Sequence, residues 1–323
     1  THEIFRLGIR KLLPEQVELI SGPGCPVRVT QVGFIDEAIY LALERQVTIC
    51  TFGDLVRVPG TNMSLAGARE RGAKIRIVYS PVDAKEYAKE HPKEQVTFLS
   101  VGFETTTPSA CLSVKKAREE GLTNYSILTA NKTMPQAYEA LKGSADIFLY
   151  PGHVNAITGT KLCEELAKEG VSGVVAGFTA KELLTALAVA LAWFQEGRPF
   201  FVNCYPRVVT ENGSPQAQKL VEEMMEPCDS EWRGLGVIKG SGMRLQEEWS
   251  AFDARKKYKI PLIQGKANPA CRCGDVLQGK CKPSDCKVFG KVCTPQHPIG
   301  ACMVSGEGAC SAYYMYGEAE KMK

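Results

Sequence analysis

Seven cysteines lie close together near the end of this 323-residue chain, and their chemistry is the first question that the sequence raises. Thiols at this density form disulfides, hold a zinc ion or hold an iron–sulfur cluster. Disulfides alone would leave an odd thiol, and the other cysteines argue against an oxidising compartment. The seven are Cys271, Cys273, Cys281, Cys286, Cys293, Cys302 and Cys310.

The spacing of these cysteines favours an iron–sulfur cluster over structural zinc. Zinc sites usually contain two C-x2–4-C knuckles, and here only Cys281 and Cys286 have such a spacing, apart from the very tight C-x-C at residues 271–273. In an all-cysteine cluster each thiolate binds a different corner of a preformed cube, so irregular spacings are tolerated. Spacing alone does not select four ligands from the seven.

A further candidate is the thiol of Cys25, in the stretch SGPGCPVRVT at residues 21–30. The flanking glycines and prolines predict a stiff, exposed turn at the end of a strand, where ligands bind in open α/β sheets. Arg28 is expected to lower the thiol pKa and so favour the thiolate. The alternative is an ordinary strand–helix turn with an idle cysteine.

Two other strand ends carry ionisable side chains. Glu104 lies in SVGFETTTPS, where Thr106 or Thr107 is expected to cap the next helix, so Glu104 lies just outside that helix. His153 lies in the glycine-flanked stretch YPGHVNAITG. For each the alternative is structural: a charge that complements the helix dipole, or an imidazole that makes a hydrogen bond.

The expected helices and strands that position these residues indicate an α/β protein. Short β-branched runs alternate with helical patterns, which predicts parallel sheets. Helices are expected at 33–45, 137–142 and 214–225, and the apolar run LLTALAVALAWF at 183–194 is expected to be a buried helix. Strands are expected at 17–21, 47–52, 75–79, 96–101, 125–129, 147–150 and 171–176.

The chain divides, on this pattern, into two successive parallel-sheet α/β domains and a C-terminal cysteine-rich iron–sulfur domain. A polar link at His91-Pro92-Lys93 places the first boundary, so the domains are expected at residues 1–92, 93–214 and 215–323. The last has few apolar runs and is expected to need a covalent or metal staple.

Composition excludes several classes of protein. A formal net charge of +3 is too small to indicate nucleic acid or an anionic membrane surface as a partner. The longest apolar run is too short to cross a membrane, and no G-x-S-x-G, HExxH or GxGxxG motif supports a hydrolase or a nicotinamide enzyme. The scattered cysteines are most simply buried hydrophobes, which predicts a cytoplasmic protein; they are Cys50, Cys111, Cys163, Cys204 and Cys228.

Five motifs together resemble the HypD family of hydrogenase maturation factors. They are GPGCPV (22–27), VGFETTTP (101–108), PGHVNAITG (151–159), RGLGVIKGSG (233–242) and CTPQHPIGACMVSGEGACSAYY (293–314), in the order of the family. The cluster signature of that family, C-x14–16-C-x6-C-x16-C, fits Cys271, Cys286, Cys293 and Cys310. The resemblance therefore implies a 4Fe-4S cluster on these four, and a redox-active disulfide between Cys273 and Cys302. It leaves Cys281 without a role.

The resemblance also implies a function. HypD-like proteins pair with a HypC-type chaperone and hold one iron while cyanide and carbon monoxide are installed. Cyanide arrives from a HypE-type partner, and the finished Fe(CN)2CO unit passes to the large subunit of a nickel–iron hydrogenase. Thiolate is a suitable ligand for such iron, and His2, Cys25, Glu104 and His153 become candidates to line the iron site.

The chain departs from the family at two points. In the family a Cys-Gly pair precedes Thr-His-Glu, and that cysteine is the main candidate iron ligand, whereas this sequence starts at Thr1-His2-Glu3. The family motif GPGCPVC ends in a cysteine where this chain has Arg28. The chain is therefore expected to hold its cluster but to assemble iron poorly.

Two other classes of function compete with the maturation scaffold. One is a metabolic oxidoreductase that uses the same cluster on a small molecule, and the other is a zinc-stabilised interaction module. Turnover of a soluble substrate without partner proteins favours the first, and metal analysis identifies the second.

Overall fold

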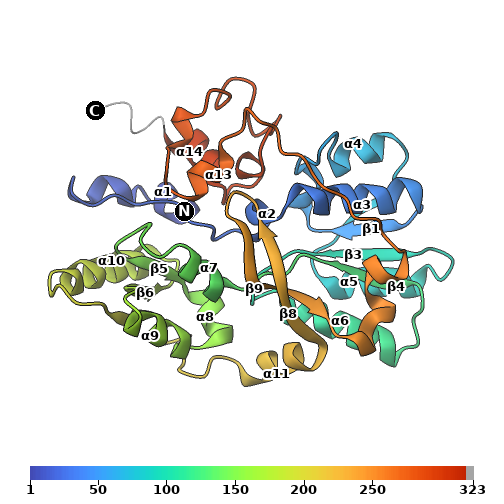
Figure 1. Ribbon diagram of the computed structural model, residues 1–323, viewed down its shortest axis with the longest axis horizontal. Helices are drawn as coiled ribbons and strands as arrows, with labels where there is room; N and C mark the ends of the chain where they lie inside the picture. Colours follow the sequence, from blue (N-terminus) through green and yellow to red (C-terminus); the bar gives the residue numbers. More distant parts are fainter. Residues whose placement is uncertain (318–323) are drawn as a thin grey trace.

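The first α/β unit is built on a four-stranded parallel sheet. The computed structural model describes residues 1–317 (Figure 1). Strands β1 (Thr48–Thr51), β2 (Ile75–Ile77), β3 (Val96–Ser100) and β4 (Tyr125–Thr129) pair in the order β2-β1-β3-β4. Every residue of β1, β3 and β4 is buried, as expected of a parallel sheet covered on both faces.

Alternate residues of these strands enter two different cores. Leu99 and Leu128 face the core beneath α3 (Val32–Glu44) and α4 (Leu65–Glu70). Phe98 and Ile127 face the opposite core, beneath α5 (Pro81–Glu90) and α6 (Thr107–Glu119). A short 3-10 helix, η2 (Gly53–Arg57), follows β1. The two-residue period of a strand thus joins both helical layers through one sheet.

The domain boundary predicted at residue 92 falls inside this sheet and is corrected. β1 pairs with β3 across that position, with Thr48 opposite Val96. The polar residues at 91–93 form only the turn between α5 and β3, where Glu94 N–H donates to His91 O at 2.9 Å. A polar Pro-containing loop has the same composition within a domain as between domains, so the sequence signal was ambiguous.

The second α/β unit contains a three-stranded parallel sheet, β5-β6-β7. Its strands are β5 (Phe148–Pro151), β6 (Gly173–Ala176) and β7 (Phe201–Asn203). Its helices are α7 (Met134–Ala140), α8 (Gly152–Thr158), α9 (Lys161–Lys168) and α10 (Ala180–Phe194). The predicted α/β class with parallel sheets is confirmed, and the two sheets divide between β4 and β5.

Three local predictions were wrong. The segment 17–21 forms no strand, and β7 was missed because it is only three residues long. The helix α10 is amphipathic, with Leu187 buried but Trp193 and Phe194 on the surface at 38% and 50% exposure. A run of apolar residue types does not reveal that this helix packs on the central strand β6 with one side only and exposes the other.

An antiparallel hairpin lies between the two α/β units (Figure 1). It follows α11 (Pro215–Met224) and consists of β8 (Met225–Trp232) and β9 (Gly236–Leu245). After it, η3 (Glu247–Phe252) and α12 (Ala254–Lys257) pack against β4 of the first sheet. The domain predicted at 215–323 is therefore not one unit, because its first part belongs to the α/β core.

The cysteine-rich part begins after the chain has crossed back over α3, where Gly265 lies against Gly33. It contains α13 (Cys273–Leu277), η4 (Pro283–Asp285), η5 (Ala301–Met303) and α14 (Ala309–Tyr316). The start of the chain joins it: α1 (His2–Arg6), followed by η1 (Ile9–Leu12), packs against α14, and α2 (Pro26–Val29) packs against η5. Among residues 1–317, no helix is long and apolar enough to span a membrane.

Candidate functional site

The four cysteines expected to hold a cluster line one small cavity, together with Cys273 and Cys302. The rest of the lining is mainly apolar, with no carboxylate or imidazole: Arg272, Val276, Val288, Phe289, Gly300 and Met303. The donor set is thus all sulfur, which fits an iron–sulfur cluster. The cavity volume is about 10 Å³, room for about one water molecule, so the thiol side chains must rotate outward to admit a larger group.

Short turns present these thiols. Cys271 precedes α13, Cys286 follows η4, and Cys310 lies in the first turn of α14. Cys293 closes a tight loop in which its N–H donates to Val288 O at 2.9 Å. The expected ligands therefore come from four separate segments, and only the packing of those segments brings the sulfurs together.

The sulfur of Cys293 accepts a hydrogen bond from the backbone N–H of Ile299 at 3.3 Å. The next residue is Gly300, and a Cβ at this position would lie 2.4 Å from Cys271 Sγ. The backbone at 299–300 thus approaches two of the expected ligands at once. Hydrogen bonds to cluster sulfurs are one way in which a protein sets a cluster potential.

The thiols of Cys273 and Cys302 lie side by side, with their sulfur atoms 2.7 Å apart. All thirteen cysteines are free in the structure. Hydrogen bonding to Cys273 lowers the pKa of Cys302, but hydrogen bonding to Cys310 and burial raise it to about 12. The pair is thus neutral and buried, and it adjoins the cavity that both residues line.

The prediction for Cys25 was wrong in its electrostatics. Cys25 is only 4% exposed, so the turn is not an open one. Burial raises the pKa of this thiol, and the nearby charge of Arg28 only partly opposes that shift. Desolvation outweighs one neighbouring cation here, because the turn is covered by η5 and by the hairpin.

Glu104 lies between the loops of the two α/β units. Its Oε1 accepts a hydrogen bond from the N–H of Met134 at 2.8 Å, so it satisfies the start of α7 and not that of α6. Its Oε2 is buried without a hydrogen-bond partner among residues 1–317. Burial raises the pKa of Glu104 to about 7, so this carboxyl can hold or release a proton near neutral pH.

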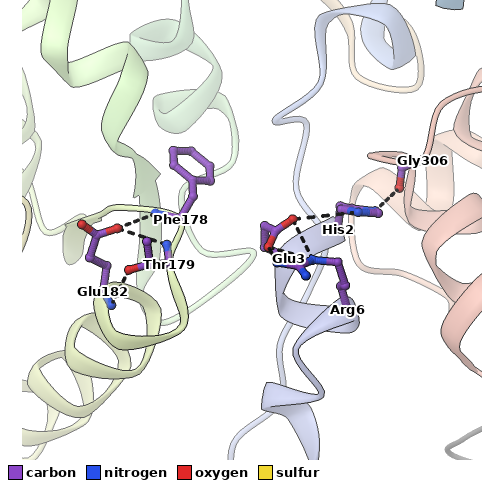
Figure 2. A network of polar contacts seen from close by, with 7 residues as sticks. All are labelled: His2, Glu3, Arg6, Phe178, Thr179, Glu182 and Gly306. Carbon is purple, nitrogen blue, oxygen red and sulfur yellow. Dashed lines mark hydrogen bonds and ion pairs between the residues drawn. The ribbon is translucent and has the colours of Figure 1, made fainter.

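The two candidate histidines are not brought together. His153 is exposed on α8 and packs against Phe178, with ring centroids 4.4 Å apart. His2 lies on α1, where its Nδ1 is 3.0 Å from Gly306 O (Figure 2). Figure 2 shows the Phe178 loop facing α1 from the second α/β unit. His2 therefore belongs to the cysteine-rich part, whereas His153 belongs to the opposite unit.

Sequence reasoning missed Arg233 and the fully buried Trp232. The indole of Trp232 stacks on the ring of Phe103, with the ring centroids 5.9 Å apart. The backbone of Trp232 forms an antiparallel bridge with Thr30. Arg233 donates from its backbone N–H to Val29 O at 2.8 Å. The hairpin turn thus ties the Cys25 segment to the Glu104 loop; the motif RGLGVIKGSG was the available signal.

The same turn of the hairpin, between β8 and β9, also contacts the cysteine-rich part. A Cβ on Gly234, which has φ of +83°, would lie 2.3 Å from the Cα of Gly274 in α13. Only glycine permits this backbone contact.

No group of three His, Cys, Asp or Glu side chains within residues 1–317 is arranged to hold a single metal ion.

Comparison with known proteins agrees with this organisation. A family model described as "HypD: Hydrogenase formation hypA family" matches residues 1–317. The hydrogenase maturation factor HypD of Cupriavidus necator is 42% identical over 98% of this chain and 87% of its own length. Those of Rhizobium leguminosarum bv. viciae and Escherichia coli are 43% and 42% identical, over 98% and 99% of this chain and 86% and 87% of their own lengths. The chain therefore belongs to the HypD family.

Proposed function

We propose that this chain is an iron–sulfur scaffold on which the Fe(CN)2CO unit of nickel–iron hydrogenase is assembled. Its partners are a HypC-type chaperone and a HypE-type cyanide donor, and the hydrogenase large subunit receives the product. The observation that carries the proposal is the convergence of Cys271, Cys286, Cys293 and Cys310 on one cavity whose only metal-binding side chains are thiols. We propose that this assembly takes place in the cytoplasm.

The four cysteines are proposed to hold a 4Fe-4S cluster. When bound, such a cluster supplies single electrons. The apolar lining from buried Val276 and partly buried Val288 and Phe289 limits the access of water to the four proposed ligands. Because the thiols must lose their protons to bind iron, cluster insertion releases protons from this site.

Cys273 and Cys302 are proposed to act as a redox pair beside the cluster. Exchange with an external disulfide oxidises the two thiols to one disulfide bond, and the external disulfide takes up the two electrons and two protons to become two thiols; an external dithiol reverses the step. Their separation of 2.7 Å supports the pairing. Because α2 packs against η5, this pair lies near Cys25, which is proposed to ligate the cargo iron.

The remaining candidates, His2, Glu104 and His153, are proposed to line the site of the cargo iron. His2 lies on the helix that packs against α14, and Glu104 presents one unpaired, buried oxygen. Glu104 is suited to hold a proton, because burial raises its pKa to about 7. His153, on the opposite unit, is proposed to line the iron site only when the units approach each other around the iron.

Anaerobic reconstitution with iron and sulfide tests the cluster. We expect a brown protein with equal iron and sulfide content, and loss of the visible absorption in Cys286→Ala and Cys293→Ala. Cys281→Ala is the matched control, because Cys281 does not line the cavity. A colourless protein that binds zinc, or equal loss of colour in the Cys281 variant, contradicts the proposal. Turnover of a small molecule without partners would favour the oxidoreductase instead.

A further inference from the structure

Two guanidinium groups from distant parts of the chain flank the cysteine site. Arg28 lies on α2, which packs against η5, the short helix that carries Cys302. Arg233 directly follows β8, and the next residue of this turn is in contact with α13, the helix that begins at Cys273. Each arginine is thus delivered to the site by a different element.

Backbone carbonyls fix the position of both side chains. Arg28 donates from Nη2 to Gly22 O at 2.8 Å. Arg233 donates from Nε to Thr30 O at 2.9 Å. Each guanidinium therefore has one anchored edge, and its remaining N–H groups are held in place for another acceptor.

Those remaining groups include buried donors without partners. Arg28 is only 1% exposed, and its Nε and Nη1 have no hydrogen-bond partner within residues 1–317. Nη2 of Arg233 is also buried and without a partner in that range. A buried charge with unsatisfied donors is costly unless a negative group faces it.

The groups that face these donors are the thiols of the site. Burial works against the charge of Arg28, yet the thiols of Cys302, Cys25 and Cys273 raise the pKa of this guanidinium above its ordinary value. Arg233 lies close enough to Cys271 and Cys273 for its charge to act on both side chains. Both cations therefore lie beside the sulfur-lined cavity without lining it.

We propose that Arg28 and Arg233 are the counter-charges of the cluster site and hold the reduction potential of the bound cluster above the value that neutral side chains would allow. This inference rests on the proposed cluster. An iron–sulfur cluster with four thiolate ligands carries a net negative charge, and net charge and hydrogen bonds set its potential. A nearby cation favours the reduced form, because that form is the more negative.

Spectroelectrochemical titration of the reconstituted full-length chain tests this inference. Arg28→Gln and Arg233→Gln remove one charge each, and Arg233→Lys keeps the charge on a different side chain. Arg244→Gln is the matched control, because Arg244 lies on β9 of the hairpin that also places Arg233, but is exposed and paired with Glu226 at 2.8 Å. The chain is poised with mediators, and cluster absorption, electron paramagnetic resonance and iron content are measured on each variant.

We expect each Gln variant to keep its iron and to shift the ratio of reduced to oxidised cluster at a fixed potential by about tenfold toward the oxidised form. That shift equals about 59 mV for a one-electron couple. Arg233→Lys should stay close to the unmodified chain, as should Arg244→Gln. The comparison does not depend on hydrogenase maturation activity.

Several outcomes overturn the inference. Potentials of both Gln variants that match that of Arg244→Gln show that the two charges do not act on the cluster. A shift in Arg233→Lys as large as that in Arg233→Gln assigns the effect to packing instead of charge. If one Gln variant fails to fold, the other decides the question. An unmodified chain that takes up no cluster overturns the proposed function as well, whereas a bound cluster with unchanged potentials overturns this inference alone.

Discussion

The sulfur atoms of Cys273 and Cys302 lie 2.7 Å apart in a buried pair that adjoins four further thiols. The two residues are brought together by the packing of α13 and η5 against α14. Mild oxidation of the cluster-free chain with diamide should therefore join these two cysteines first, because a small movement makes the bond. Peptide mass spectrometry after alkylation reads out the pairing.

The control for this prediction is Cys302→Ser, in which Cys273 should be recovered as an alkylated thiol. Cys281 should stay free in both proteins, although it is the more accessible thiol. Preferential oxidation of Cys281, or a bond between Cys273 and Cys271, would contradict the predicted pair.

A methyl group at residue 300 should disturb the cluster site more than the fold. A Cβ on Gly300 would lie 2.4 Å from Cys271 Sγ, so the thiol side chain must move away. We expect Gly300→Ala to lose iron to a chelator about tenfold more readily than the unmodified chain. Gly67→Ala is the control, because its Cβ meets only Met63 Cβ at an ordinary 3.4 Å. Equal iron retention in the two variants would show that Cys271 is not a ligand.

Lys132 should be a main stabilising residue of the hairpin. Its buried Nζ donates to Ser230 Oγ at 2.6 Å and to Glu231 O at 2.7 Å. Lys132→Met leaves both acceptors without this donor, so we expect the free energy of unfolding to fall by about 2 kcal/mol in urea titrations. Lys239→Met, at an exposed position of the same hairpin, should change it by less than about 0.5 kcal/mol. An equal effect of the two substitutions would contradict the assigned role.

Glu104 should make stability depend on pH. Burial raises its pKa from 4.5 to about 7 in the folded chain. The folded state then binds the proton more tightly than the unfolded state, so this group stabilises the fold below about pH 4.5, and its contribution is lost as the pH rises to about 7. The loss is up to about 3 kcal/mol. Glu104→Gln should abolish it, as measured by urea unfolding across this range.

Glu182 provides a contrast of opposite sign. Its carboxylate accepts hydrogen bonds from the N–H groups of Thr179 and Phe178 (Figure 2). It also accepts hydrogen bonds from Arg207, and this contact is the main cause that lowers its pKa to about 2. Its contribution to stability is present above pH 4.5 and is lost as the pH falls toward 2. Glu182→Gln should therefore leave the stability between pH 5 and 7 with an unchanged slope. A slope that changes in Glu182→Gln but not in Glu104→Gln would contradict both assignments.

Much of the fold could be predicted from local patterns. The β-branched runs that end at Ser100 and Thr129 are strands because both faces of a parallel sheet are buried, and that requirement appears directly in the residue types. The order of the strands could not be predicted, because pairing of β1 with β3 across residue 92 depends on tertiary packing. The hairpin was missed because β8 alternates buried and exposed residues that include Pro227 and several charges.

For the site, the sequence by itself determined the stock of thiols, their spacing and the presence of Arg28 three residues after Cys25. Only the tertiary structure decided that six cysteines line one cavity, that Cys25 is buried, and that Gly234, next to Arg233, contacts α13 at Gly274. The physical reason is desolvation: a side chain's charge state and neighbours depend on which distant segments exclude water from it, and no local pattern encodes those segments.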